Sequence, residues 1–178
     1  MGSFAESLHV AFFGNARYFA EELFHESFRL PFPVPRDHAG LSIPTPPENW
    51  RQEVAFYKWP DGHLEAVGFC NWIRYENCYL CGGMCARASF YRRMPREDWL
   101  ACRDRGGIAQ IMLQTAFATL TDCSAWFGYC GDRKAYIVDI RSGYQPTRHR
   151  HLIVKWNGEL TEGHKRELED RIAAIGPF

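Results

Sequence analysis

Arg103-Asp104-Arg105-Gly106-Gly107-Ile108-Ala109 stands directly before the strongest helical pattern in the chain. One face of that helix, expected over residues 107–121, carries Ile108, Ile111, Met112, Thr115, Ala116 and Leu120. Small residues at a helix start let backbone N–H groups approach an anion, and the helix N-terminus adds a partial positive charge. Arg103 and Arg105 would add charge-assisted hydrogen bonds to a phosphate. A tight turn into a helix has the same appearance, so the neighbouring elements must decide between the two.

Three strand patterns precede this stretch and are joined by tight turns. Alternating side chains predict strands over residues 53–59, 64–75 and 78–89. Pro60-Asp61-Gly62 and Glu76-Asn77 separate them, which predicts an antiparallel meander. Gly82-Gly83 lies inside the third strand, where it predicts a bulge or a close approach to the backbone.

The N-terminal part predicts a strand over residues 8–13, a helix over 15–28 and then a proline-rich loop. The inward side chains expected of the helix are Phe19, Leu23, Phe24 and Phe28. The loop, at about residues 31–49, contains Pro31, Pro33, Pro35, Pro44, Pro46 and Pro47. Because prolines remove backbone donors and fix φ, this loop is expected to cover the sheet, either as a lid over a pocket or as a structural wrap.

The remaining elements alternate helix and strand. Helices are expected within 91–105 after Pro95, over 133–142 and over 162–175, and strands over 124–130 and 147–156. Asp132 and Thr161 suit N-caps, and Gly143 suits a helix end. The order β-α-loop-β-β-β-α-β-α-β-α predicts an α/β (α+β) fold: a mixed, mostly antiparallel central sheet flanked by helices, in one domain over residues 1–178.

Composition argues against several classes of protein. Lys plus Arg and Asp plus Glu number 21 each, so no broad positive field exists to bind nucleic acid non-specifically. No stretch approaches the roughly 20 apolar residues that cross a bilayer, and the N-terminal apolar run is too short for a signal peptide. The 7 cysteines therefore favour reduced thiols in a cytoplasmic protein.

Two motifs, together with the order of elements, resemble the GNAT superfamily of acyl-CoA-dependent N-acyltransferases over about residues 50–156. The diphosphate loop of that family reads Gln/Arg-x-x-Gly-x-Gly/Ala before an apolar helix. This chain matches the loop at Gly107 and Ala109 and departs from it at Asp104, which takes the first position. Farther on, the family's Asn…Ala…Gly-Phe pattern is similar to Asp132, Ala135 and Gly143-Tyr144.

The resemblance implies a GNAT-like fold that transfers an acyl group, in the first instance acetyl, from acyl-CoA directly to a primary amine. The pantetheine arm would lie between residues 78–89 and 125–130, beside Met84, Cys85, Ala86 and Arg87. The diphosphate would bind at Arg103, Arg105, Gly106, Gly107, Ile108 and Ala109. The expected partners are acyl-CoA and an amine-bearing acceptor of unspecified class, with no membrane. The zero net charge argues against nucleic acid, and a homodimer is compatible with the sequence.

The implied catalytic residues depart from the family pattern. Many members place a tyrosine four residues before the Gly-aromatic pair, as general acid to the departing thiolate, and Asp139 stands there instead. Tyr136 lies three residues earlier on nearly the same helix face, so it is the expected acid, with Asp139 or His149 as the expected base. A solvated Asp139 and a core Tyr136 account for the spacing equally well.

Two other functions stay open: a catalytically silent GNAT-fold module that binds acyl-CoA or a protein, and a GNAT-fold enzyme that modifies a nucleic-acid base. An acyl-cysteine route through Cys130 would need a histidine within reach. A zinc site is a further alternative, with the candidate ligands Cys78, Cys81, Cys85, His149 and His151. Strand alternation puts Cys81 and Cys85 on one face and Cys78 on the other, so no metal site is expected.

Overall fold

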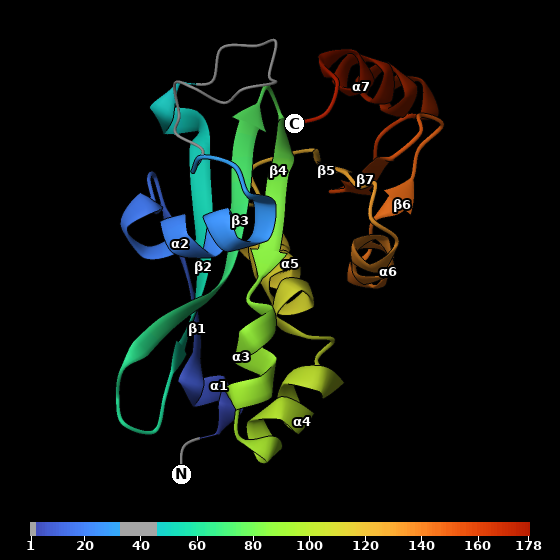
Figure 1. The fold of residues 1–178 in the computed structure, drawn as a ribbon. Coiled ribbons are helices and arrows are strands. Elements are labelled where there is room, and N and C mark those ends of the chain that lie inside the picture. Colours follow the sequence, from blue (N-terminus) through green and yellow to red (C-terminus); the bar gives the residue numbers. More distant parts are fainter. Residues whose placement is uncertain (1–2, 33–45) are drawn as a thin grey trace.

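Seven strands form one sheet in the order β1-β2-β3-β4-β5-β7-β6 (Figure 1) in the computed structural model, which describes residues 3–32 and 46–178. The strands are β1 (Leu8–Phe13), β2 (Trp50–Lys58), β3 (Leu64–Tyr75), β4 (Cys78–Ala86), β5 (Ala125–Tyr129), β6 (Gln145–Pro146) and β7 (Leu152–Trp156). Among these strands only β4 and β5 pair in parallel. The predicted mixed, mostly antiparallel sheet flanked by helices is confirmed.

Helices cover both faces of this sheet. They are α1 (Phe4–Ser7), α2 (Arg17–Phe28), α3 (Ala88–Arg93), α4 (Arg96–Asp104), α5 (Ile108–Thr119), α6 (Arg133–Ser142) and α7 (Glu162–Ile175), with a 3-10 turn η1 (Pro47–Asn49). On one face α3, α4 and α5 pack around Trp72, Phe90 and Met112. On the other face lie α2, in front of the sheet in Figure 1, and α7. Within the described residues, each helix is too short or too polar to span a bilayer.

The first turn of α5 approaches the sheet closely at Gly68 of β3. The helical spacing of the apolar side chains buries Ile108, Met112 and their neighbours along one stripe. A Cβ atom at Gly68 would lie 2.8 Å from Cγ2 of Ile108 and 2.5 Å from Sδ of Met112. The missing side chain therefore fixes where the N-terminus of α5 stands relative to β3 and β4.

Local capping signals predict the bounds of α6 and α7 correctly. The Asp132 carboxylate accepts hydrogen bonds from the backbone N–H groups of Lys134 and Ala135, which begins α6. Gly143 ends α6 in the left-handed conformation. The Thr161 side chain accepts from the N–H of His164 at the start of α7.

Several predicted elements differ from the structure in their bounds. The helix expected over residues 15–28 begins at Arg17, and Phe19 is 43% exposed instead of turned inward. Phe19 lies at the edge of the buried stripe and packs against Phe13, with ring centroids 5.0 Å apart, while Ala20 takes the inward position. The third strand of the meander ends at Ala86 instead of residue 89, because α3 begins two residues later.

The strand expected over residues 147–156 is shorter than predicted. It begins at Leu152, because residues 147–151 form a turn in which His151 has a φ of 68°. The short strand β6 pairs with β7, so two strands follow Gly143 where the sequence predicts one. Of the proline-rich covering loop, residues 33–45, with Pro33, Pro35 and Pro44, lie outside the described residues.

A bulge interrupts β4 at Gly82-Gly83, as the sequence predicts. The register passes from Cys70↔Met84 to Trp72↔Cys81, so β4 advances three residues while β3 advances two. Gly83 has a φ of 114°, which favours glycine at the extra residue. The prediction that Cys81 and Cys85 share a face is wrong, because the extra residue reverses the alternation. Cys81 packs beneath α5, and Cys85 packs beneath α2.

Candidate functional site

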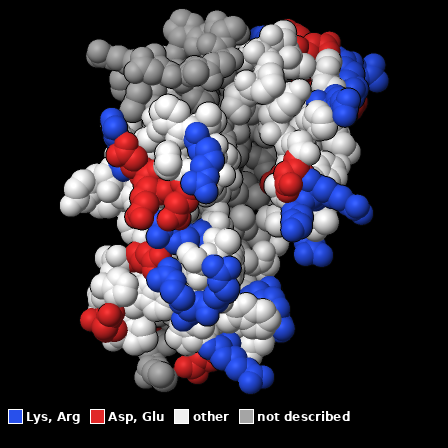
Figure 2. Space-filling view, viewed as in Figure 1, with Lys and Arg blue, Asp and Glu red and all other residues white. Residues whose placement is uncertain are grey.

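The parallel strands β4 and β5 pair over only part of their length. Their register runs from Cys78↔Ala125 to Cys81↔Gly128 and stops there. Beyond this point β4 continues beside β3, while β5 stays with β7, so the two strands separate. A cavity of about 540 Å³ opens between them, and we call it the β4–β5 cleft. Figure 2 shows the hollow between α2 and α6. Its volume is within the range of small-molecule sites.

Side chains from both faces of the sheet line the β4–β5 cleft. From the α5 and α6 side come Ala109, Val138, Asp139 and Tyr144. From the α2 side come Phe28, Cys85 and Phe178. The cleft therefore connects the two faces of the sheet, and most of its lining is apolar. Such a passage suits an extended apolar chain with a few polar groups at fixed places.

Tyr144, which follows the C-terminal glycine of α6, supplies the most unusual polar group in the β4–β5 cleft. Its side chain is 3% exposed, and its hydroxyl has no hydrogen-bond partner among the described residues. It lies at the apex of the cleft, where a Cβ atom on Gly128 would be 3.8 Å from Cζ of Tyr144. Burial raises the pKa of Tyr144 well above its usual value, and nearby thiols and carboxylates add to this. The hydroxyl is therefore protonated at neutral pH and free to donate.

Asp139 and Cys130 contact one another on the wall of the same cleft. Burial raises the pKa of the Asp139 carboxyl, and the Cys130 thiol partly opposes this. Burial, followed by the interaction with Asp139, raises the pKa of Cys130 to about 12. Cys130 is thus a neutral thiol at pH 7, which argues against an acyl-cysteine intermediate. Asp139, with its raised pKa, suits a proton acceptor better than an ordinary surface carboxylate does.

The glycine turn before α5 leaves fewer amides open than the sequence suggests. Gly106 and Gly107 have φ values of 84° and 91°, and their N–H groups donate to backbone carbonyls of α4, each at 2.9 Å. The N–H of Ile108 donates to the hydroxyl of Tyr91 at 3.1 Å. The N–H groups of Ala109 and Gln110 have no such partner in the described part of the chain, and Ala109 lines the β4–β5 cleft. Among the described residues, the backbone N–H groups left without a partner at this turn therefore begin at Ala109.

Comparison with solved structures identifies the fold. No protein-family model matches the sequence, and no curated protein is significantly similar to it. A structure from Lactobacillus plantarum, assigned as an N-acetyltransferase, is 14% identical, with a TM-score of 0.50 over 85% of this chain and 99% of that chain. The chain has the GNAT fold.

Two further GNAT-fold structures are more distant. The Escherichia coli ribosomal-protein-S18-alanine N-acetyltransferase is 9% identical, with a TM-score of 0.49 over 87% of this chain and 97% of that one. AtaTR bound with AcCoA is 13% identical, with a TM-score of 0.42 over 93% of this chain and 99% of that one. Two other neighbours, with TM-scores of 0.43 and 0.41, are complexes with DNA and with tRNA. The expectation that nucleic acid is no partner of this chain stays a prediction.

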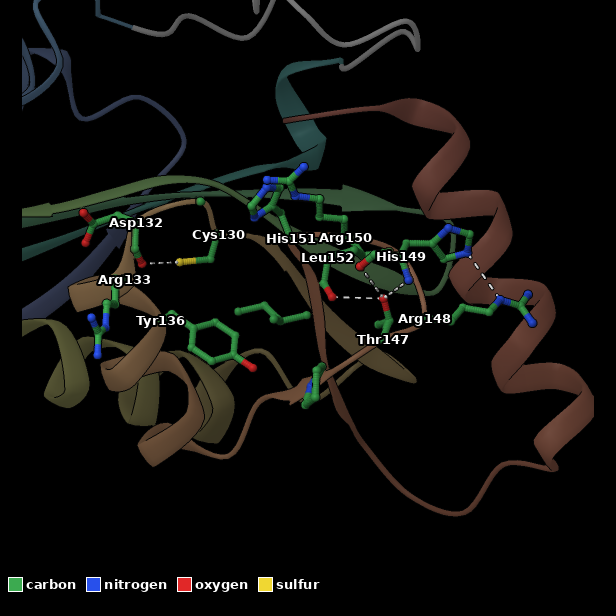
Figure 3. A pocket seen from close by; sticks show the side chains of 13 residues that line it. Cys130, Asp132, Arg133, Tyr136, Thr147, Arg148, His149, Arg150, His151 and Leu152 are labelled. Carbon is green, nitrogen blue, oxygen red and sulfur yellow. Dashed lines mark hydrogen bonds between the residues drawn. The ribbon is translucent and has the colours of Figure 1, made fainter.

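In this GNAT fold the residues predicted as catalytic do not come together. Asp139 lines the β4–β5 cleft, whereas Tyr136 and His149 line a second cavity beyond α6 (Figure 3). Tyr136 is 36% exposed, and Nε2 of His149 is 2.8 Å from a carboxylate oxygen of Asp170 in α7. The catalytic roles of Tyr136 and His149 stay predictions. The sequence analysis missed Tyr144, although a tyrosine in place of the phenylalanine of the family's Gly-Phe pair was a signal.

The cofactor residues predicted from the GNAT resemblance divide into two groups. Met84, Cys85, Ala86 and Ala109 line the β4–β5 cleft. The N–H groups of three other predicted residues, Gly106, Gly107 and Ile108, already donate hydrogen bonds within the protein, as described above. Arg105 is exposed and has no ion pair among the described residues.

Two predicted arginines point away from this GNAT cleft. The guanidinium of Arg87 lies 3.4–3.8 Å from carboxylates of Glu22, Glu26 and Glu65. Arg103 donates to Asp104 at 3.0 Å and lies over the ring of Trp99. Lys134, at the start of α6, lines the cleft, and the sequence analysis did not include it. In residues 3–32 and 46–178 no group of three His, Cys, Asp or Glu side chains is placed to hold a metal ion.

Proposed function

We propose that this protein is an N-acyltransferase that transfers an acyl group, in the first instance acetyl, from acyl-CoA to a primary amine by direct attack. The observation that carries the proposal is the β4–β5 cleft, which holds the buried, unpartnered hydroxyl of Tyr144 at its apex. A buried hydroxyl without a partner costs free energy, so its retention in a ligand-sized cavity favours a chemical role.

The β4–β5 cleft fits the pantetheine arm of acyl-CoA. Residues Met84 to Ala86 of β4 pair with β3 on one side only, because β5 has separated from them. Their other edge therefore presents backbone groups to the cleft, and an amide-containing chain can pair with such an edge as an added strand. Coenzyme A would supply the activated thioester, and a volume of about 540 Å³ accommodates the arm but leaves the nucleotide outside.

The diphosphate would bind at the N-terminus of α5, at the open N–H groups of Ala109 and Gln110. Ala109 lines the cleft, and both N–H groups carry the partial positive charge of the helix end. Lys134 stands across the cleft and Arg105 on the preceding turn, so each can add a charge-assisted contact. The proposed diphosphate site therefore begins at Ala109 in α5, whereas the sequence predicted it to begin in the glycine turn before α5.

Tyr144 and Asp139 would move the protons. The acceptor ammonium first releases one proton to solvent. The neutral amine nitrogen then attacks the thioester carbon, the C–S bond breaks, and the sulfur leaves as a thiolate. Tyr144 donates its proton to that sulfur, and Asp139 takes the proton that the new amide nitrogen loses. Transfer of this proton from Asp139 to Tyr144 restores both groups, so each turnover is balanced. The raised pKa of both residues keeps the hydroxyl protonated and brings the carboxylate nearer the operating pH.

A matched pair of tyrosine variants tests this assignment. With acetyl-CoA and a panel of primary amines, thiol release measures the reaction. Tyr144→Phe should lower kcat by about 10²–10⁴-fold, the usual contribution of a general acid. It should leave stability unchanged or raise it by about 1 kcal/mol, because the deleted hydroxyl has no partner. Tyr18→Phe, at an exposed tyrosine of α2 that lines neither the cleft nor the cavity beyond α6, is the control and should retain activity. Loss of activity in Tyr136→Phe alone would assign the acid to Tyr136 instead.

The silent-module alternative gives a different outcome in the same assay. An inert acyl-CoA-binding protein would gain thermal stability from acetyl-CoA, by roughly 2.7 kcal/mol at 100 times Kd, yet would release no thiol with any amine. If acetyl-CoA caused no thermal shift and no thiol were released, the β4–β5 cleft would not be an acyl-CoA site.

A further inference from the structure

A second cavity adjoins the β4–β5 cleft on the far side of the end of β5. We call it the basic bay, and its volume is about 390 Å³. Its walls include Arg133 and Tyr136 of α6 and the turn from Thr147 to His151 (Figure 3). Residues 130–132 and Ile153 line both the basic bay and the β4–β5 cleft. A molecule in the basic bay can therefore reach the cleft past the end of β5.

Positive charge in the basic bay exceeds negative charge. Arg148 and His149 turn toward α7, where Asp170 binds both of them. Arg133 and Arg150 have no ion pair among the described residues. The carboxylate of the acidic lining residue, Asp132, is held by the first amides of α6. Arg133 and Arg150, which have no ion pair among the described residues, thus line a cavity whose acidic residue is already engaged.

The turn that carries Arg150 is held in a fixed conformation. The hydroxyl of Thr147 donates to the carbonyl of Leu152 at 2.9 Å, and the N–H of Cys130 donates to the carbonyl of His151 at 2.8 Å. His151 adopts a φ of 68°, which L residues rarely occupy unless the surroundings impose it. Because Cys130 also lines the β4–β5 cleft, the turn is tied to the site where the amine would react.

We infer that the acceptor amine carries an anionic group, a phosphate or a carboxylate, and that the basic bay binds this group. The inference rests on the proposed transferase function. Guanidinium groups bind phosphate and carboxylate through paired, charge-assisted hydrogen bonds. The same positive charge repels the ammonium end of the acceptor. An anionic amine is thereby oriented with its anion in the basic bay and its nitrogen toward Asp139 in the β4–β5 cleft.

Amines matched in all but their anionic group test this inference. Thiol release from acetyl-CoA is measured with phosphoethanolamine against ethanolamine and with glycine against glycinamide. At least one anionic amine should exceed its neutral partner about tenfold or more in kcat/KM. Arg150→Gln should raise its KM by about tenfold, the usual worth of a hydrogen bond to a charged group. Arg141→Gln, an exposed arginine of α6 outside the bay, is the matched control and should not change KM.

Two further measurements show whether the basic bay binds an anionic group of the acceptor or a phosphate of the cofactor. Inorganic phosphate should compete with the anionic acceptor and not with acetyl-CoA. If Arg150→Gln instead weakened acetyl-CoA binding and spared the acceptor preference, the bay would bind a phosphate of the cofactor and the inference would be wrong. Equal rates for both members of each pair would also overturn it while leaving the transferase proposal intact. Absence of thiol release with every amine would overturn the transferase proposal, and the inference with it.

Discussion

Replacing Gly68 by alanine tests how closely α5 must approach the sheet. The new Cβ would lie 2.5 Å from Sδ of Met112, 2.8 Å from Cγ2 of Ile108 and 3.3 Å from Cβ of Ala55. The Met112 side chain is flexible and can move away. The branched Ile108 side chain cannot, because it is buried in the first turn of α5. We therefore expect Gly68→Ala to push the N-terminal turn of α5 away from β3.

Two opposing effects set the magnitude of this change. Overpacking of a tight core costs about 1–3 kcal/mol, whereas replacing a strand glycine by alanine returns roughly 0.5–1 kcal/mol. Taken at the middle of each range, the net loss of unfolding free energy is about 1 kcal/mol. For a chain of this size each kcal/mol corresponds to about 2–4 °C in Tm. Because Ala109 and Gln110 move with the same turn, acetyl-CoA affinity should fall as well.

Urea unfolding and acetyl-CoA titration measure the two effects of Gly68→Ala separately. Gly14→Ala is the control, because its new Cβ would meet no atom within 4 Å. It should leave both stability and affinity unchanged. If Gly68→Ala were as stable as the wild type, the close packing of α5 on β3 would be refuted. If it were destabilised but bound acetyl-CoA normally, the N-terminus of α5 would not hold the diphosphate.

Two further substitutions test buried polar groups. Burial raises the pKa of Glu53 from 4.5 to about 8, partly opposed by its hydrogen bond from Trp72. The contribution of Glu53 to stability is full below pH 4.5 and is lost as the pH rises to about 8, at up to ~1.4 kcal/mol per pH unit. Glu53→Gln does not titrate, so the fall in its unfolding free energy over this pH range, measured by urea unfolding, should be smaller. Tyr91→Phe removes the acceptor of the Ile108 N–H and should cost about 1 kcal/mol in urea unfolding. It should not lower acetyl-CoA affinity, because the proposed diphosphate amides begin one residue later.

Local signals predict much of the fold. The second meander strand and the helices α6 and α7 have the predicted bounds, because their turns and caps are encoded by adjacent residues. Asp132 and Thr161 each satisfy amides within three residues of themselves. The short β6 was not predicted because it depends on pairing with β7. The turn before β7 was not predicted because it depends on contacts between distant residues, such as the hydrogen bond from the N–H of Cys130 to the carbonyl of His151.

The candidate site was predictable only where position along the chain determines position in space. Met84 and Ala109 follow from strand order and from the glycine turn, and both line the β4–β5 cleft. Tyr144 was missed because its burial depends on residues of other elements, such as Phe117 of α5, whose ring centroid lies 5.4 Å from that of Tyr144. The helical spacing puts Tyr136 and Asp139 on nearly the same face of α6. In the structure, however, Tyr136 lines the basic bay and Asp139 lines the β4–β5 cleft.

One extra residue on β4 links the main failure of the sequence analysis to the candidate site. The bulge at Gly82-Gly83 begins directly after Cys81, which is also the last residue of β4 that pairs with β5. A bulge bends its strand and increases the local twist. β4 therefore keeps its pairing with β3 but leaves β5, and the β4–β5 cleft opens at that point. The same extra residue turns Cys85 toward α2. Alternation therefore fails to predict side-chain direction at the point where β4 opens the space that a thioester would enter.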